Sequence, residues 1–132
     1  MVPGTTIEKD PVVTLAGTER AYVFVEVNAS EKLTDYIEYG IDSAWTKLTG
    51  VDGVDNVYYK KDVTPGTSLD VLAKRDVNGV QKQAVKVKDS VNNKLMEDAK
   101  ENEPTLTFKA YAIQAENIAT PVDAWNAIVA AK

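Results

Sequence analysis

The segment that most constrains the fold spans residues 20–28, with the sequence RAYVFVEVN. Successive side chains of a β-strand point to opposite faces of a sheet. In a strand here, Val23 and Val25 would share one face, and Tyr22 and Phe24 would share the other. Because both faces are apolar in the middle of the segment, we expect a central strand that is covered on both sides.

Further short strands are expected along most of the chain, separated by closely spaced turn signals such as Pro65-Gly66 and residues 76–79. Residues 57–59 favour a strand and residues 68–74 run back from the Pro65-Gly66 turn, which predicts a hairpin. We expect about seven or eight strands in all, a pattern typical of an antiparallel β-sandwich.

The end of the chain carries a helix signature. Thr120 can cap a helix, Pro121 suits its first position, and Asp123 follows three residues after the cap. The apolar stripe expected on this helix consists of Val122, Trp125, Ile128 and Val129. The sequence therefore predicts a C-terminal amphipathic helix.

A short internal helix is predicted around Leu95, Met96 and Ala99, where helix formers replace β-formers. With 132 residues, the chain has the length of one domain. We therefore expect residues 1–132 to form one mainly β domain, a jelly-roll-like or immunoglobulin-like antiparallel β-sandwich with a short internal helix and a C-terminal helix.

Composition limits the function. The chain has no histidine and no cysteine, so it lacks the commonest general base, the commonest metal ligand and any thiol nucleophile. We expect a protein that is not an enzyme and holds no cofactor or catalytic metal. A net charge of -5 argues against binding to nucleic acid or to an anionic membrane surface. No apolar run reaches about 18 residues, so no membrane span is expected.

One loop could bind a cation weakly. The stretch GVDGVDN places Asp52, Asp55 and Asn56 close together, and clustered oxygens suit calcium. The same residues also favour turns, because Asp and Asn side chains bond to their own backbone. The stretch does not match the EF-hand pattern, and we favour the turn.

Aromatic residues and the C-terminal helix each allow two interpretations. The aromatic side chains could form a platform for sugars, although packing in the core is the commoner role. The helix around Trp125 could bind a partner, although covering one face of the sandwich is the commoner role. The aromatic residues concerned are Tyr22, Phe24, Tyr36, Tyr39, Tyr58, Tyr59 and Tyr111.

Both ends of the chain resemble a known family. Residues 3–27, PGTTIEKDPVVTLAGTERAYVFVEV, combine a Pro-Gly turn, a Lys-Asp-Pro block and a Tyr-Val-x-Val strand. Residues 108–128, FKAYAIQAENIATPVDAWNAI, combine an Ala-Tyr-Ala-Ile-Gln strand and an Ala-Trp helix. These segments resemble the TasA/camelysin family of secreted proteins with SipW-dependent signal peptides. The resemblance implies a jelly-roll-like sandwich, export to the cell surface, and a role as a biofilm-matrix or fibre subunit.

The resemblance also implies a mode of assembly. In members of the family a signal peptide and a further strand precede the Pro-Gly turn, and we expect both to precede this chain. In fibre-forming relatives that strand completes the sheet of the next subunit, so copies join head to tail, and other matrix proteins are further candidate partners.

An open sheet edge is a template for such an added strand, and contacts that do not close on themselves build filaments. Residues 20–27 and 107–114 are the expected flanks of the acceptor groove. The candidate residues of this edge are Tyr22, Phe24, Val25, Phe108, Tyr111 and Ile113.

Two other functions fit the same sequence. An adhesin or ligand-binding module at the cell surface would use the tyrosines and the acidic loops. A protease is suggested by the camelysin name, but the chain has no His-Glu-x-x-His motif and no histidine at all. The structural subunit is the favoured hypothesis.

Overall fold

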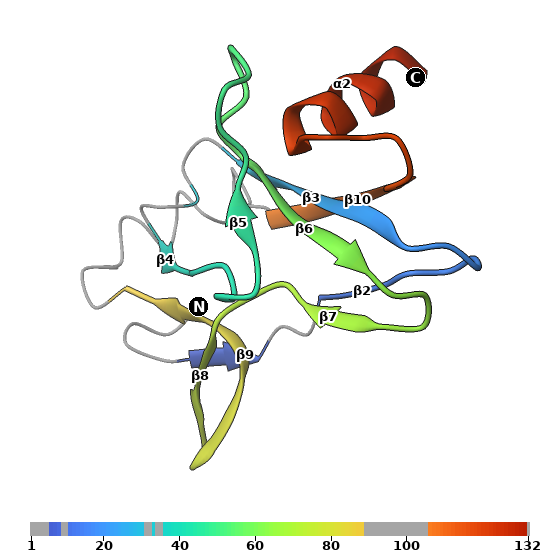
Figure 1. Cartoon of the computed structure of the whole chain (residues 1–132). Helices are drawn as coiled ribbons and strands as arrows, with labels where there is room; N and C mark the ends of the chain where they lie inside the picture. The colour runs from blue at the N-terminus through green and yellow to red at the C-terminus, as the bar shows by residue number, and fades with distance from the viewer. Residues whose placement is uncertain (1–5, 9–10, 31–32, 34–35, 89–105, 132) are drawn as a thin grey trace. The chain divides into compact units, whose positions relative to one another are not determined.

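The computed structural model describes residues 6–8, 11–30, 33, 36–88 and 106–131. Within these ranges the chain forms antiparallel β-sheets and one α-helix at the C-terminus (Figure 1). The mainly β prediction is confirmed. The internal helix predicted around Leu95, Met96 and Ala99 lies outside the described residues. The described chain divides into two compact units, one centred on strand β9 and one on strand β3.

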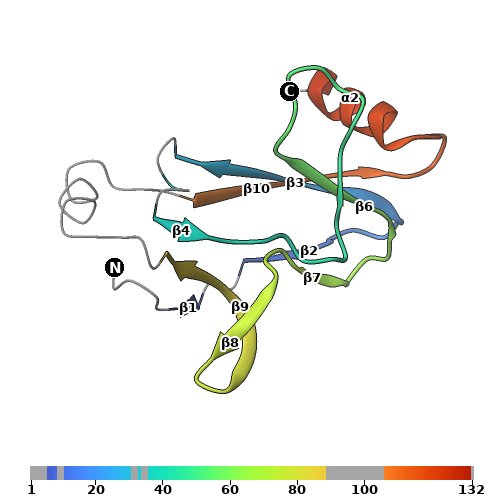
Figure 2. The same ribbon diagram turned by 90° about the vertical axis from the view of Figure 1, so that its left-hand side faces the viewer.

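The first unit is a sheet built around β9 (Val80–Val87). Strands β1 (Thr6–Glu8) and β4 (Ile37–Glu38) pair with the second half of β9, one on each side. Strand β8 (Lys74–Val77) pairs with the first half of β9 to form a hairpin. Figure 2 shows β8 and β9 as this hairpin, with β1 beside β9.

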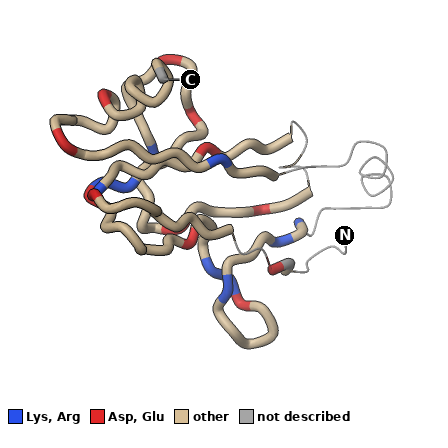
Figure 3. Tube along the Cα trace, turned by 90° about the vertical axis from the view of Figure 1, so that its right-hand side faces the viewer, with Lys and Arg blue, Asp and Glu red and all other residues tan. Residues whose placement is uncertain are grey.

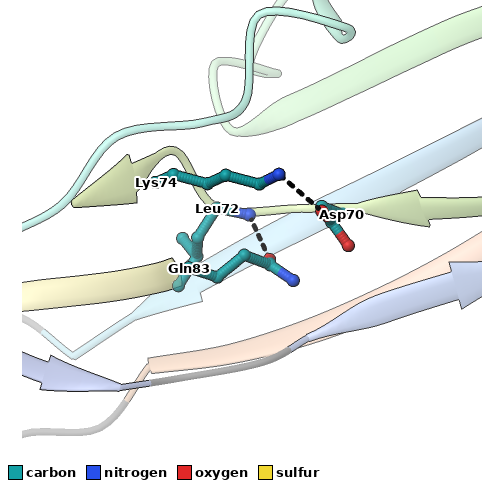
Figure 4. Close-up of polar contacts among 4 residues, drawn as sticks. All are labelled: Asp70, Leu72, Lys74 and Gln83. Atoms are coloured by element: carbon teal, nitrogen blue, oxygen red, sulfur yellow. Dashed lines mark hydrogen bonds and ion pairs between the residues drawn. The ribbon is translucent and has the colours of Figure 1, made fainter. Parts of the chain in front are cut away.

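Buried side chains fill the first unit. Tyr36, Val71, Leu72 and Val87 are all fully buried. The polar Gln83 is also buried, and its Oε1 accepts a hydrogen bond of 2.8 Å from the Leu72 N–H (Figure 4). Because a buried amide without a partner is costly, this bond explains how a glutamine is tolerated in the core.

Pro11 lies between two short strands near the start of the chain. Its carbonyl accepts a bond from the Val71 N–H at 3.1 Å, but proline has no N–H to return. The Val71 carbonyl is satisfied instead by the N–H of Asp42 at 2.9 Å. The segment therefore forms two short strands in different sheets, β1 before Pro11 and β2 (Val12–Thr14) after it.

The second unit contains most of a four-stranded sheet in the order β10-β3-β6-β5 (Figure 1). These strands are β10 (Leu106–Gln114), β3 (Ala21–Ala29), β6 (Val57–Val63) and β5 (Thr46–Lys47). Strand β3 lies between two neighbours, so the prediction of a central strand at residues 20–28 is confirmed. Its apolar residues Val23, Phe24 and Val25 are at most 1% exposed.

The predicted hairpin around Pro65-Gly66 is wrong in its pairing. The turn itself is present, since the Thr67 N–H bonds to the Thr64 carbonyl and Gly66 has a φ of 86°. However, β7 (Ser68–Asp70) pairs with β2 and not with β6. A bulge at the end of β6, where Asp62 has a φ of 54°, redirects the chain before the turn.

The C-terminal helix α2 (Pro121–Ala131) begins as predicted. The Thr120 Oγ1 accepts a bond of 3.1 Å from the Asp123 N–H, and Pro121 occupies the first turn. The predicted apolar stripe is wrong at one position. Val129 is 47% exposed, because the helix turns Ala124 and Trp125 toward the sheet instead.

None of the helices formed by the described residues has both the length and the apolar character needed to cross a membrane.

Candidate assembly edge

The predicted edge residues fall on two strands with different environments. Tyr22, Phe24 and Val25 belong to β3, which is paired on both sides, and their side chains are buried. Phe108, Tyr111 and Ile113 belong to β10, which is an outer strand of its sheet. Among the described strands, β10 is therefore the one of the two predicted flanks that lies at an edge of its sheet.

The pairing of β10 with β3 is fixed near both ends. The Ala115 N–H bonds to the Arg20 carbonyl at 3.0 Å, and the Thr107 Oγ1 donates to the Asn28 carbonyl at 3.4 Å. Thr107 and Ala115 are separated by as many residues as Arg20 and Asn28. The residue numbers rise along one strand as they fall along the other. The strands are therefore antiparallel and in one register between these contacts.

This register determines which backbone groups of β10 face outward. In an antiparallel ladder, alternate residues bond to the partner strand and the residues between them point away from it. Since Ala115 bonds to β3, the N–H and C=O groups of Ala112, Ala110 and Phe108 point away from β3. Among the described strands, β3 is the one that pairs with β10. The outer side of β10 therefore presents backbone groups in the arrangement that another strand can bind.

One face of β10 is held by the helix. Tyr111 and Ile113 pack against the buried cluster that contains Phe24 and Trp125. The rings of Tyr111 and Trp125 meet edge to face, with centroids 5.7 Å apart. The ring centroids of Trp125 and Phe24 are also close, at 5.4 Å. These contacts confirm that the helix covers one face of the sheet, and they hold the edge strand in place.

The opposite face of β10 is more open. By strand alternation it carries Phe108, Ala110 and Ala112. Phe108 is partly buried, and both alanines are exposed. An added strand would lie beside β10 in the plane of the sheet, and these two small side chains leave room on this face for larger side chains of the new neighbour.

Charge is sparse on this strand. Lys109 is the one charged residue within β10, and it is exposed. Elsewhere, lysines, arginines and acidic residues are spread along the described chain and do not gather in one segment (Figure 3). Edge strands often carry a lysine, because burying its charge opposes pairing with a second apolar strand. Lys109 therefore limits which strands can be added.

The aromatic residues are mainly structural. Tyr22, Phe24 and Tyr36 are buried, which confirms the core role for these three. The rings of Phe24 and Tyr59 lie 6.2 Å apart, and Tyr59 packs against the same cluster. An exposed platform for sugars therefore has little support from this set.

The loop that carries Asp52 and Asp55 forms a β-turn. The Val54 N–H bonds to the Val51 carbonyl at 3.3 Å, and Gly53 has a φ of 77°. Both aspartates are exposed. In the described part of the chain, no three His, Cys, Asp or Glu side chains are grouped so that they could hold a metal ion. The turn accounts for the glycine at position 53 and for the exposure of Asp52 beside it.

Sequence reasoning missed Lys109, Ala110 and Ala112. Their types are ordinary for a strand, and their role depends on which neighbour β10 lacks. The available signal was the long run of residues 106–114 directly before the C-terminal helix, which allows a terminal strand at a sheet edge.

Searches against protein-family models, curated proteins and solved structures found no match for this chain.

Proposed function

We propose that the protein is a secreted structural subunit that assembles by adding an extended strand from another copy to the outer side of β10. The observation that carries this proposal is the position of the nine-residue strand β10. One face of β10 packs against the buried cluster, and among the described strands it pairs with β3 alone. The resemblance of both chain ends to the TasA/camelysin family supports the same function. It also supports an extracellular location and a jelly-roll-like or immunoglobulin-like sandwich as the finer fold.

The energetics of strand addition fit this edge. Each new backbone hydrogen bond contributes a net stabilisation of about 0.5–1.5 kcal/mol. Phe108, Ala110 and Ala112 each offer a donor and an acceptor on the outer side. Because β10 is already fixed by β3 and α2, little conformational entropy of the acceptor would be lost on binding. Most of the conformational entropy lost on binding would be that of the added strand.

The geometry of the contact would decide the product. A donor segment and an acceptor edge are different surfaces of one subunit, so each subunit can bind the next. Such a heterologous contact continues without closing and produces a filament. Pairing of two β10 edges across a twofold axis would instead end at a dimer.

A proline placed at Ala112 tests the proposal. Ala112 directs its N–H away from β3, so Ala112→Pro removes an outward donor and leaves the β3 ladder intact. Full-length mature protein would be followed by light scattering and electron microscopy. We expect the parent to form fibres and Ala112→Pro to remain monomeric, with a melting temperature close to that of the parent.

Lys47→Pro is the matched control. Lys47 lies on β5, at the other edge of the same sheet, between residues Thr46 and Leu48, which pair with β6. Its N–H also points outward, so this variant should assemble like the parent. Fibres of Ala112→Pro as abundant as those of the parent, or a parent that stays monomeric at high concentration, would refute the proposal.

A further inference from the structure

The tip of the β8–β9 hairpin has an uncommon backbone. Val77 and Val80 form its last pair, and Asn78 and Gly79 make the two-residue turn between them. Asn78 has a φ of 52° and Gly79 a φ of 85°. Two successive left-handed residues define the type I′ turn, which favours Asn-Gly because its twist matches that of the strands. The turn predicted for residues 76–79 is therefore confirmed.

This tip is open to water. Asn78 and Gly79 are both exposed, and the neighbouring Val80 is 53% exposed. A Cβ built on Gly79 would meet no atom within 4 Å. The Asn78 side chain makes no hydrogen bond to any described residue. Nothing described around the turn therefore shields the amide of Asn78 or the backbone nitrogen of Gly79.

We propose that Asn78 is a site of spontaneous deamidation. The backbone nitrogen of Gly79 loses its proton and attacks Cγ of Asn78, and the new N–Cγ bond closes a succinimide ring. The Cγ–Nδ2 bond breaks, and the amide nitrogen takes up a proton and leaves as ammonia. Water then opens the ring. Addition at Cγ gives aspartate, whereas addition at the backbone carbonyl gives isoaspartate, in which the chain continues through Cγ. Water is the one co-reactant, and no oxidation or reduction occurs.

A second exposed asparagine provides an internal comparison. Asn117 is also left-handed, with a φ of 64°. It is followed by Ile118, whose β-branched side chain crowds the backbone nitrogen. The N–H of Ile118 is also bonded to the Ala115 carbonyl at 3.2 Å. Asn117 therefore shares the exposure and the backbone conformation of Asn78 but lacks an accessible neighbouring nitrogen.

The two products differ in their effect on the hairpin. Aspartate keeps the backbone, and it tolerates the left-handed conformation nearly as well as asparagine. Isoaspartate adds an atom to the main chain within a two-residue turn, so the Val77–Val80 pair cannot keep its register. Deamidation through the second route would therefore open the tip of the hairpin. This inference is independent of the proposed assembly.

The experiment is incubation of the folded protein at mildly alkaline pH, followed by trypsin digestion and mass spectrometry. Trypsin releases Asp76–Lys82, which contains Asn78, and digestion in ¹⁸O water marks any conversion that occurs during handling. Isoaspartate is detected separately with an isoaspartyl methyltransferase. We expect the amide of Asn78 to be lost while that of Asn117 is retained.

Two comparisons make the outcome decisive. The synthetic peptide Asp76–Lys82 gives the rate without the fold. Asn78→Asp should show no further mass change, and it should form isoaspartate much more slowly than the parent, because a carboxylate is a poorer target for attack than an amide. If Asn78 keeps its amide while the peptide has converted completely, the turn protects the site and the proposal fails. Equal loss at Asn117 would overturn the role assigned to the Gly79 nitrogen.

Discussion

Asp62 is held in a left-handed conformation within a strand. Ala21 pairs with Val63 and Val23 pairs with Lys60, so β6 has one residue more than β3 between these pairs. The bulge that results places Asp62 at a φ of 54°. Most side chains disfavour this region because their Cβ approaches the following carbonyl, whereas Asp and Gly accept it more readily.

The effect of substituting Asp62 on stability should therefore depend on how readily the new residue adopts a left-handed backbone. We expect Asp62→Val to lower the free energy of unfolding by about 1–2 kcal/mol, and Asp62→Gly to change it little. Urea denaturation measures both changes. Lys61→Val is the control, since Lys61 is an exposed neighbour with an ordinary φ. Equal losses in the two valine variants would show that strand packing, and not the left-handed backbone, sets the cost.

Residue-level features differ in how far the sequence predicts them. The turns at Pro65-Gly66 and Asn78-Gly79 follow from local chemistry, because each pair of residues suits one turn type. The bulge at Asp62 does not. Its position depends on the register with β3, which lies far away in the sequence.

At the scale of elements, the helix α2 depends on its first turn. Thr120→Ala removes the oxygen that accepts from the Asp123 N–H, and it should cost about 1 kcal/mol of stability. Thr120→Ser keeps the acceptor and should stay close to the parent in thermal unfolding. A loss of the same size in both variants would mean that the threonine methyl group, and not the cap, contributes the stability.

We expect Lys109 to oppose the pairing of the edge strand β10 with other strands. Lys109→Ala removes its one charge, so β10 should pair more readily with other edges. We expect this variant to self-associate at a lower concentration than the parent in sedimentation velocity. Lys47→Ala removes an exposed lysine from the other edge of the same sheet and serves as the charge-matched control. Identical behaviour of the two variants would exclude a specific role for Lys109.

Long elements were predicted well, and their pairing was not. The strand at residues 20–28 and the C-terminal helix have strong patterns and definite end signals. The interpretation of residues 57–74 as a hairpin failed because the bulge at Asp62 and the pairing of β7 with β2 are long-range features. The prediction that Val129 belongs to the buried face of the helix is wrong because the apolar residues span a wide part of the helix surface. Contacts with the sheet, which the local sequence does not specify, decide which of them are buried.

At the scale of the whole molecule, charge opposes assembly. Each chain carries a net charge of -5, so copies repel one another at long range. Added salt screens this repulsion, with a Debye length of about 10 Å at 0.1 M. We expect fibre growth to accelerate as sodium chloride rises from low to physiological concentration, as followed by light scattering. Slower growth with salt would indicate that ion pairs hold the subunits together.

The whole fold could be predicted only as a class. Turn spacing and strand composition predict antiparallel β-structure, since both are local properties. The position of β10 at an edge, on which the proposed function depends, follows from the order of strands in the sheet. That order depends on contacts between segments such as residues 21–29 and 106–114, which local patterns do not specify.

The contact between Trp125 and Tyr111 makes the edge strand optically visible. The chain has two tryptophans, and Trp45→Phe would leave Trp125 as the single indole fluorophore. Trp125 is 4% exposed and touches a ring that belongs to β10 itself. A strand that binds to β10 and displaces Tyr111 slightly would alter the emission wavelength or quantum yield of this indole. The protein thus contains its own fluorescent reporter, and binding at the edge could be titrated without an added dye.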